Sequence, residues 1–176
     1  YRYFLKTTGI QKKIQEILHG LNTRNINNLS SRGHAIRALI LKTDFPKDFE
    51  EAIVREYKKF GKDMDVAVRS SATAEDLPDA SFAWQQESFL NISGSYELLE
   101  AVKRCMASLF TNRAISYRED KKFDHFSIAL SVGIQKMVRS DRASSGVMFT
   151  IDPDSGHPNV IVINASYGLG ETVVKG

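Results

Sequence analysis

Cysteine, tryptophan and proline are scarce in this chain of 176 residues: it contains one cysteine, one tryptophan and four prolines. Because Cys105 is the single cysteine, no disulfide can form within the chain, as is typical of proteins in a reducing compartment. Cys105 lies in an apolar helical pattern, so we expect a buried and inert thiol. No apolar run approaches the roughly 20 residues that span a bilayer, and no signal peptide is evident. We therefore expect a cytoplasmic protein without a membrane partner.

An excess of charge of one sign is also missing. The chain has 24 Lys and Arg against 21 Asp and Glu, a formal net charge of +3. The basic residues are spread out, and pairs such as Lys12 and Lys13 stand close to acidic residues, whereas nucleic-acid binding requires a clustered basic face. The chain further lacks an initiator Met and stops abruptly at Gly176, so we expect a single domain that is a piece of a longer protein.

The first third of the chain has the apolar spacing of helices. Residues 10–21 and 25–42 each carry isoleucine and leucine at helical intervals. Pro46 and the acidic residues after it favour the first turn of a third helix, which Gly61 is placed to end. We therefore expect residues 1–61 to form a helical segment and residues 62–176 to form the core of the domain.

Strand patterns dominate the rest of the chain. Residues 127–138 alternate with a period of two, with Ile128, Leu130, Val132, Ile134 and Val138 expected on one side. Residues 145–151 and 159–165 flank a turn sequence, Asp152 to Gly156, and predict a hairpin. Shorter strands are expected at 65–70 and 87–92, a long polar loop between them, and one helix over 96–117. This order of elements predicts an α+β fold with a mostly antiparallel sheet.

Two segments carry side chains that could bind a ligand. Arg69 stands at a strand end before the polar loop, where a guanidinium either clamps phosphate oxygens or forms a structural ion pair; position alone does not separate the two. The loop over residues 70–81 offers hydroxyls and backbone N–H groups that could cradle phosphates, although an ordinary surface loop is the simpler interpretation.

Residues 135–138 (QKMV) and 168–171 (GLGE) are weaker candidates. The first could offer backbone hydrogen bonds and an apolar face to an adenine, but a plain core strand explains it more simply. The second lacks the third glycine of a dinucleotide fingerprint. The four histidines have no metal-ligand spacing, so no metal ligand is predicted.

Taken together, these segments resemble the nucleotide-binding domain of the phosphoenolpyruvate synthase family, a domain that pyruvate phosphate dikinase and rifampicin phosphotransferase share. Residues 66–83 (VAVRSSATAEDLPDASFA) look like its signature. The other matching segments follow in the family's order: 108–110 (SLF), 113–115 (RAI), 117–118 (YR), 135–138 (QKMV), 146–150 (GVMFT) and 167–171 (YGLGE). The similarity covers nearly the whole chain and is strongest from Asp65 onward.

The resemblance implies an ATP-grasp-like fold in which ATP lies between two subdomains, with Mg²⁺ as its companion. It also implies that ATP, pyruvate and water give phosphoenolpyruvate, AMP and phosphate through a phosphohistidine domain and a pyruvate-binding domain elsewhere in a longer protein. By motif position, Arg69 would be catalytic and would contact the ATP phosphates. The other residues that the resemblance implies for nucleotide binding are Ser70, Ser71, Thr73, Gln135, Met137, Val138 and Glu171.

The chain departs from the family in three places. The family's phosphate-binding Gly-Gly-Lys segment and its later acidic, Gln and Arg ligands have no match here, and Trp84 stands where the family usually has Gly. We therefore expect weak ATP binding and no synthase activity from the chain alone. A rifampicin-type antibiotic phosphotransferase and a non-catalytic nucleotide-binding module remain the alternatives, and an apolar face that lacks its cover would favour a homodimer.

Overall fold

The computed structural model describes residues 1–72, 76–77, 80–81, 87–171 and 173. Its contacts divide the chain into two compact units, Tyr1–Met137 and Val138–Gly176, and each is described by itself. The N-terminal helices share the first unit with a three-stranded sheet. The expected division into a helical segment, residues 1–61, and a core of the domain, residues 62–176, stays a prediction.

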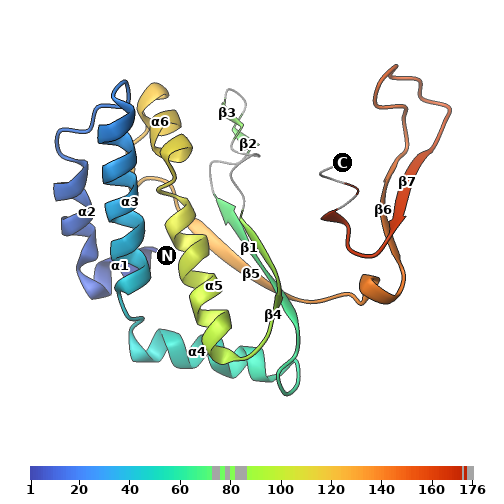
Figure 1. The fold of residues 1–176 in the computed structure, drawn as a ribbon, viewed down its shortest axis with the longest axis horizontal. Coiled ribbons are helices and arrows are strands. Elements are labelled where there is room, and N and C mark those ends of the chain that lie inside the picture. Colours follow the sequence, from blue (N-terminus) through green and yellow to red (C-terminus); the bar gives the residue numbers. More distant parts are fainter. Residues whose placement is uncertain (73–75, 78–79, 82–86, 172, 174–176) are drawn as a thin grey trace. The chain divides into compact units, whose positions relative to one another are not determined.

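Four helices precede the first strand (Figure 1), and a local signal sets each boundary. Gly9 adopts a left-handed conformation with φ of 70°, which separates the first two helices. The Asn25 side chain accepts a hydrogen bond from the backbone N–H of Asn28 and caps the third, and Pro46 precedes the fourth. These helices are α1 (Arg2–Thr8), α2 (Ile10–Leu18), α3 (Ile26–Lys42) and α4 (Lys47–Lys58).

The single helix expected over residues 96–117 is wrong, because the structure has two: α5 (Ser95–Ser108) and α6 (Asn112–Asp120). The Thr111 hydroxyl accepts a hydrogen bond from the Ala114 N–H, so a side-chain cap starts a new helix there. Arg37 of α3 donates a hydrogen bond of 2.6 Å to the carbonyl oxygen of Phe110, which satisfies backbone that the interruption frees.

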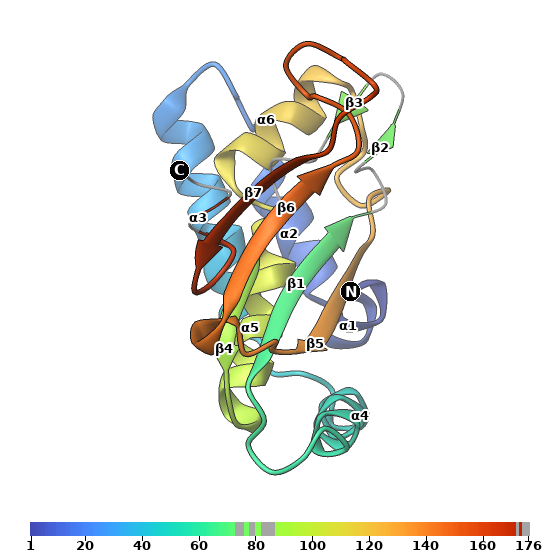
Figure 2. The same cartoon turned by 90° about the vertical axis from the view of Figure 1, so that its right-hand side faces the viewer.

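The sheet of the first unit has the order β4–β1–β5, and both pairings are antiparallel (Figure 2). Its strands are β1 (Val66–Ala72), β4 (Ser88–Ile92) and β5 (Leu130–Lys136). Within the segment expected to be a loop, β2 (Asp76–Leu77) pairs with β3 (Ala80–Ser81). Val138 was expected within the strand over 127–138, on the same side as Ile134; it lies beyond the end of β5 and is 79% exposed, so that placement is wrong.

The hydrophobic core lies between the helices and one face of this sheet. Val66 and Val68 of β1 are fully buried and belong to one cluster with residues of α3 and α5. Cys105 of α5 is also 0% exposed, which confirms the expected buried thiol. Burial, followed by the charge of Glu87, raises the pKa of this thiol to about 12.

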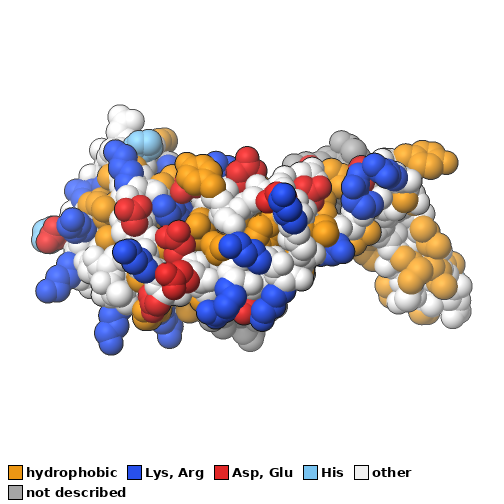
Figure 3. Space-filling model, turned by 90° about the horizontal axis from the view of Figure 1, so that it is seen from below, with side chains coloured by type: hydrophobic (Ala, Val, Ile, Leu, Met, Phe, Trp, Pro, Cys, Tyr) orange, Lys and Arg blue, Asp and Glu red, His pale blue; other side chains and the backbone are white. Residues whose placement is uncertain are grey.

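The second unit contains the predicted hairpin, formed by β6 (Ser144–Phe149) and β7 (Val162–Tyr167), after a short 3-10 helix, Ser140–Arg142. The predicted turn is present as well, since the Gly156 N–H donates to the Asp152 carbonyl oxygen over 2.8 Å. Met148, Ile163 and Tyr167 are exposed on this unit, where Figure 3 shows hydrophobic side chains gathered. The homodimer expected from such a surface stays a prediction.

Helices and antiparallel sheets together confirm the predicted α+β class. In the part of the chain that the structure describes, no helix combines the length and the apolar character that crossing a membrane would need. The cytoplasmic location remains a prediction from the sequence.

Candidate functional site

The two faces of the sheet β4–β1–β5 differ sharply. Helix α5 packs against all three strands, and in Figure 1 the helices of the first unit lie on one side of this sheet. Successive side chains of a strand point to opposite faces, so Val66, Val68 and Ser70 share the helical side. Arg69 and Ser71 point to the other face and are exposed. We call this second surface the open face.

Arg69 is the one long cationic side chain that β1 presents on the open face. Its neighbours in the antiparallel register are Ser88 on β4 and Gly133 on β5. The Arg69 Nη1 atom donates a hydrogen bond of 3.2 Å to the Ser88 hydroxyl oxygen. Among the described residues, no carboxylate lies within 4 Å of the guanidinium. Within the described residues, therefore, Arg69 does not form the structural ion pair that the sequence analysis kept as an alternative.

Two further predicted residues lie on the open face with Arg69. Ser71 follows it by two positions on β1 and is exposed. Gln135 is exposed on β5 opposite Ala67, two positions from the Gly133 that faces Arg69. Side chains two residues apart on a strand share a face, so the fold brings a guanidinium, a hydroxyl and an amide together on one surface.

Ser70 lies on the opposite face. Its side chain is buried, and its hydroxyl oxygen accepts a hydrogen bond of 2.9 Å from the Glu87 N–H and donates one of 3.4 Å to the Glu87 carbonyl oxygen. These bonds hold the end of β1 to the start of β4. The geometry thus favours a structural contribution from Ser70, and its predicted contact with a nucleotide has no support on the open face. Thr73 and Trp84 lie outside the described residues.

The remaining predicted residues follow β5. Met137 ends the first unit, half-buried, and its N–H donates to the Asp65 carbonyl oxygen over 2.9 Å. Val138 and Glu171 belong to the second unit and are both exposed. There, the Ser145 hydroxyl donates a hydrogen bond of 2.7 Å to the Gly168 carbonyl oxygen, which ties the glycine turn before Glu171 to the hairpin.

Ser88 is a residue that the sequence analysis missed. It stands at the start of β4, nineteen positions from Arg69, and only the register of the β1–β4 pair makes it a neighbour. The only signal in the sequence was that Ser88 is a polar residue near the start of the strand expected over 87–92. That signal carries no information on which residue of the partner strand lies opposite.

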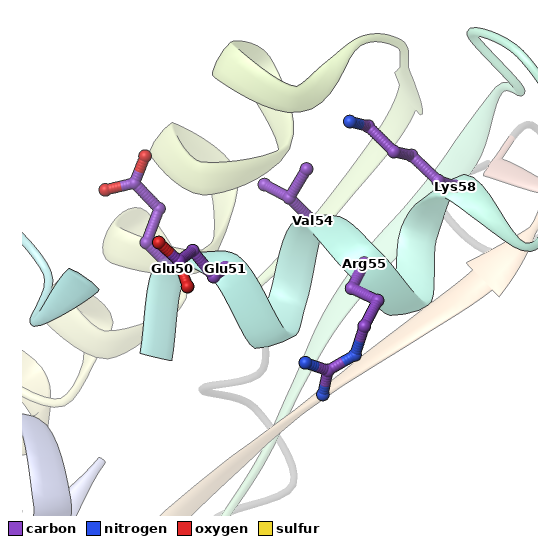
Figure 4. Close-up of a pocket in the computed structure, with 5 residues that line it drawn as sticks. All are labelled: Glu50, Glu51, Val54, Arg55 and Lys58. Atoms are coloured by element: carbon purple, nitrogen blue, oxygen red, sulfur yellow. The ribbon is translucent and has the colours of Figure 1, made fainter. Parts of the chain in front are cut away.

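Other surfaces of the described chain offer less chemistry. No group of three or more His, Cys, Asp or Glu side chains is placed to hold a metal ion within the described ranges. Figure 4 shows a hollow beside α4, whose lining residues are Glu50, Glu51, Val54, Arg55 and Lys58. All five come from one helix, with acids near its start and bases near its end, the distribution that the helix dipole stabilises.

Comparisons with known proteins identify the family of domains to which this chain belongs. The family model of the pyruvate phosphate dikinase AMP/ATP-binding domain matches residues 1–176. The chain therefore belongs to this family of nucleotide-binding domains, and the resemblance found in its motifs is confirmed.

Individual relatives are more specific. The chain is 56% identical to a phosphoenolpyruvate synthase of Aquifex aeolicus, 52% to one of Synechocystis and 49% to one of Escherichia coli. Each match covers 100% of this chain but only 21%, 23% and 23% of the relative. The chain thus spans less than a quarter of the length of these curated relatives and corresponds to the nucleotide-binding part of such an enzyme.

Proposed function

We propose that the open face binds ATP and that Arg69 contacts its phosphates. One observation carries the proposal: the guanidinium is exposed on the central strand of the sheet beside the Ser88 hydroxyl, and within the described residues no carboxylate neutralises it. A guanidinium presents paired N–H donors that match two phosphate oxygens at once. Because the chain belongs to an AMP/ATP-binding family, the phosphates of the nucleotide are the anion that we propose for Arg69.

The chemistry of phosphoryl transfer gives Arg69 a catalytic task. Transferring a phosphoryl group spreads negative charge over its oxygens, and a positioned arginine stabilises that charge in the transition state. Ser71 adds a hydroxyl donor on the same face, and Gln135 with Met137 and Val138 forms the proposed adenine-binding segment. Thr73 and Glu171 are retained from the resemblance as further proposed contacts. Ser70 was proposed with them, but its side chain lies on the buried face and bonds the Glu87 backbone, so its proposed contribution is to hold β1 beside β4.

An ATP-grasp-like arrangement is part of the proposal, supported by the α+β architecture and the family match. Mg²⁺ is proposed as the companion of the ATP phosphates. The donor set of the described residues does not form a metal site of its own, so no residue here is assigned as a magnesium ligand. In nucleotide sites Mg²⁺ usually keeps several water ligands and is held by substrate phosphates and one or two carboxylates.

For the longer protein we propose the reaction named by its relatives, the synthesis of phosphoenolpyruvate. ATP, pyruvate and water would give phosphoenolpyruvate, AMP and phosphate, with the phosphoryl group carried by a histidine on another domain. The chain covers only 21% of its Aquifex relative, so the phosphohistidine and pyruvate domains are proposed partners outside it. The isolated chain is accordingly proposed to be inactive.

The test is Arg69→Ala in the protein that carries this chain, assayed for pyruvate-dependent formation of AMP. Loss of a transition-state cation is expected to lower kcat/KM by about 100-fold or more. Arg69→Lys keeps the charge but loses the paired donors, so its kcat/KM should lie between the values of wild type and Arg69→Ala. Arg55→Ala is the matched control, since that exposed arginine pairs only with Glu56 in the described structure.

Two results would contradict the proposal. Unchanged ATP turnover in Arg69→Ala would show that Arg69 does not belong to the site. ATP consumption that needs no pyruvate, but transfers phosphate to another acceptor, would replace the proposed reaction while leaving nucleotide binding intact.

A further inference from the structure

Arg69 and Ser88 form a side-chain pair across the β1–β4 register. They are directly opposite each other, both exposed on the open face, and joined by the 3.2 Å hydrogen bond from Arg69 Nη1 to Ser88 Oγ. On the other side of Arg69 the opposing residue is Gly133, which has no side chain. Of the two residues in register with Arg69, only Ser88 can therefore restrain its side chain laterally.

Restraint matters for a side chain of this kind. A free arginine samples many rotamers, and fixing one costs up to about 2 kcal/mol of conformational entropy. A guanidinium held near its working position before the ligand arrives loses less entropy on binding. The Ser88 hydroxyl supplies such a hold on β4, whose position relative to β1 is set by backbone hydrogen bonds.

The neutrality of the partner is equally important. A carboxylate opposite Arg69 would hold the guanidinium more firmly, but it would neutralise the cation and repel a phosphate. A hydroxyl oxygen accepts one hydrogen bond and leaves the positive charge and the remaining N–H donors available. Serine at this position thus combines orientation with an undiminished charge.

We propose that Ser88 is a positioning residue that orients the Arg69 guanidinium for the phosphates of ATP. The inference rests on the proposed function, because it assumes that Arg69 contacts the nucleotide. It assigns to Ser88 an effect that passes through Arg69.

The experiment is a double-mutant cycle in the protein that carries this chain, with the dissociation constant and KM for Mg·ATP and kcat as readouts. Ser88→Ala is expected to weaken ATP binding about fivefold, the scale of one hydrogen bond. Ser88→Thr keeps the hydroxyl and should restore binding to within about twofold. Ser88→Asp should weaken binding more than Ser88→Ala, because it neutralises the cation.

The decisive comparison uses Arg69→Ala as background. There Ser88→Ala should have no further effect on ATP binding, since the group that it positions is gone. Ser31→Ala, an exposed serine of α3 whose hydroxyl bonds the Asn28 carbonyl oxygen, is the matched control and should leave binding unchanged.

The outcomes separate the two proposals. If Arg69→Ala leaves ATP binding intact, the proposed function fails. If Arg69→Ala weakens binding but Ser88→Ala does not, or if the two losses simply add, the positioning proposal alone is overturned. Failure of Ser88→Thr to recover binding would also overturn it.

Discussion

The buried guanidinium of Arg118 depends on a histidine for its hydrogen bonding. Arg118, in the last turn of α6, is 1% exposed and lies 5.3 Å from the ring centre of Phe110. Its Nε atom donates to His125 Nδ1 over 2.8 Å, and His125 Nε2 lies 2.9 Å from the Glu119 carboxylate. Because arginine can only donate, Nδ1 must accept, so the folded state requires neutral His125 with its proton on Nε2.

Replacing His125 with alanine should therefore destabilise the fold markedly. Burial lowers the pKa of Arg118 to about 10, so the side chain is still a cation at neutral pH. The variant leaves the Nε donor of this buried cation without its acceptor. Losing a hydrogen bond to a charged group costs about 1.5–3 kcal/mol, and the vacated ring volume adds to it. We expect a loss of about 3 kcal/mol and a fall in Tm of about 6–12 °C.

The same geometry predicts the sign of a pH effect. Burial and then the charge of Arg118 lower the pKa of His125, opposed by Glu119 and Asp124. The unfolded chain, with a histidine pKa near 6.5, binds the proton more readily than the folded chain. The contribution of His125 to stability is thus complete above about pH 6.5 and is lost as the pH falls through that value toward the folded pKa.

The assay is urea unfolding followed by circular dichroism, on wild type and His125→Ala, from pH 8 to pH 5. The difference in unfolding free energy between the two should shrink as the pH falls. His34→Ala, an exposed histidine of α3, is the control and should stay within about 0.5 kcal/mol of wild type. A difference that is constant, or that grows at acidic pH, would refute the argument that the folded state requires the neutral ring.

Three further predictions address other parts of the fold. Cys105, with its pKa raised to about 12, should resist alkylation by iodoacetamide at pH 8 until the chain is unfolded. Tyr57→Phe removes a hydroxyl that donates to the Met64 carbonyl oxygen and accepts from the Gly94 N–H, and should cost about 2 kcal/mol in urea unfolding. Gly146→Ala places a Cβ in a steric clash with the Asn164 carbonyl oxygen of β7, and should speed hydrogen exchange of the hairpin amides.

The periodic segments were the most predictable part of the fold. The helical spacing over 25–42 corresponds to α3, and the alternation within 127–138 contains β5. The period alone did not reveal the ends of elements. Thr111 caps a new helix inside an apolar pattern that continues on both sides, and Val138 continues the alternation after pairing with β1 has ended.

The candidate site was predictable in its residue types. Arg69, Ser71 and Gln135 were singled out by strand ends and by motifs, and the fold places all three on one face. Ser70 shows the limit of that approach, because it is adjacent to Arg69 in the motif but points to the buried face. A strand turns alternate side chains in opposite directions, so neighbours in a motif need not be neighbours in a site.

The sequence by itself determined the α+β class, the family, the hairpin of the second unit and the buried cysteine, because these depend on local periodicity, turn chemistry and motif identity. Only the tertiary structure decided that Arg69 faces away from the core, that Ser88 lies beside it and that His125 accepts a hydrogen bond from the Nε atom of the buried Arg118. Strand register and the return of the chain after α6 create these contacts. The register joins strands nineteen residues apart, and the turn after α6 returns His125 to Arg118 seven positions before it. Neither contact follows from the period or the motif of a single element.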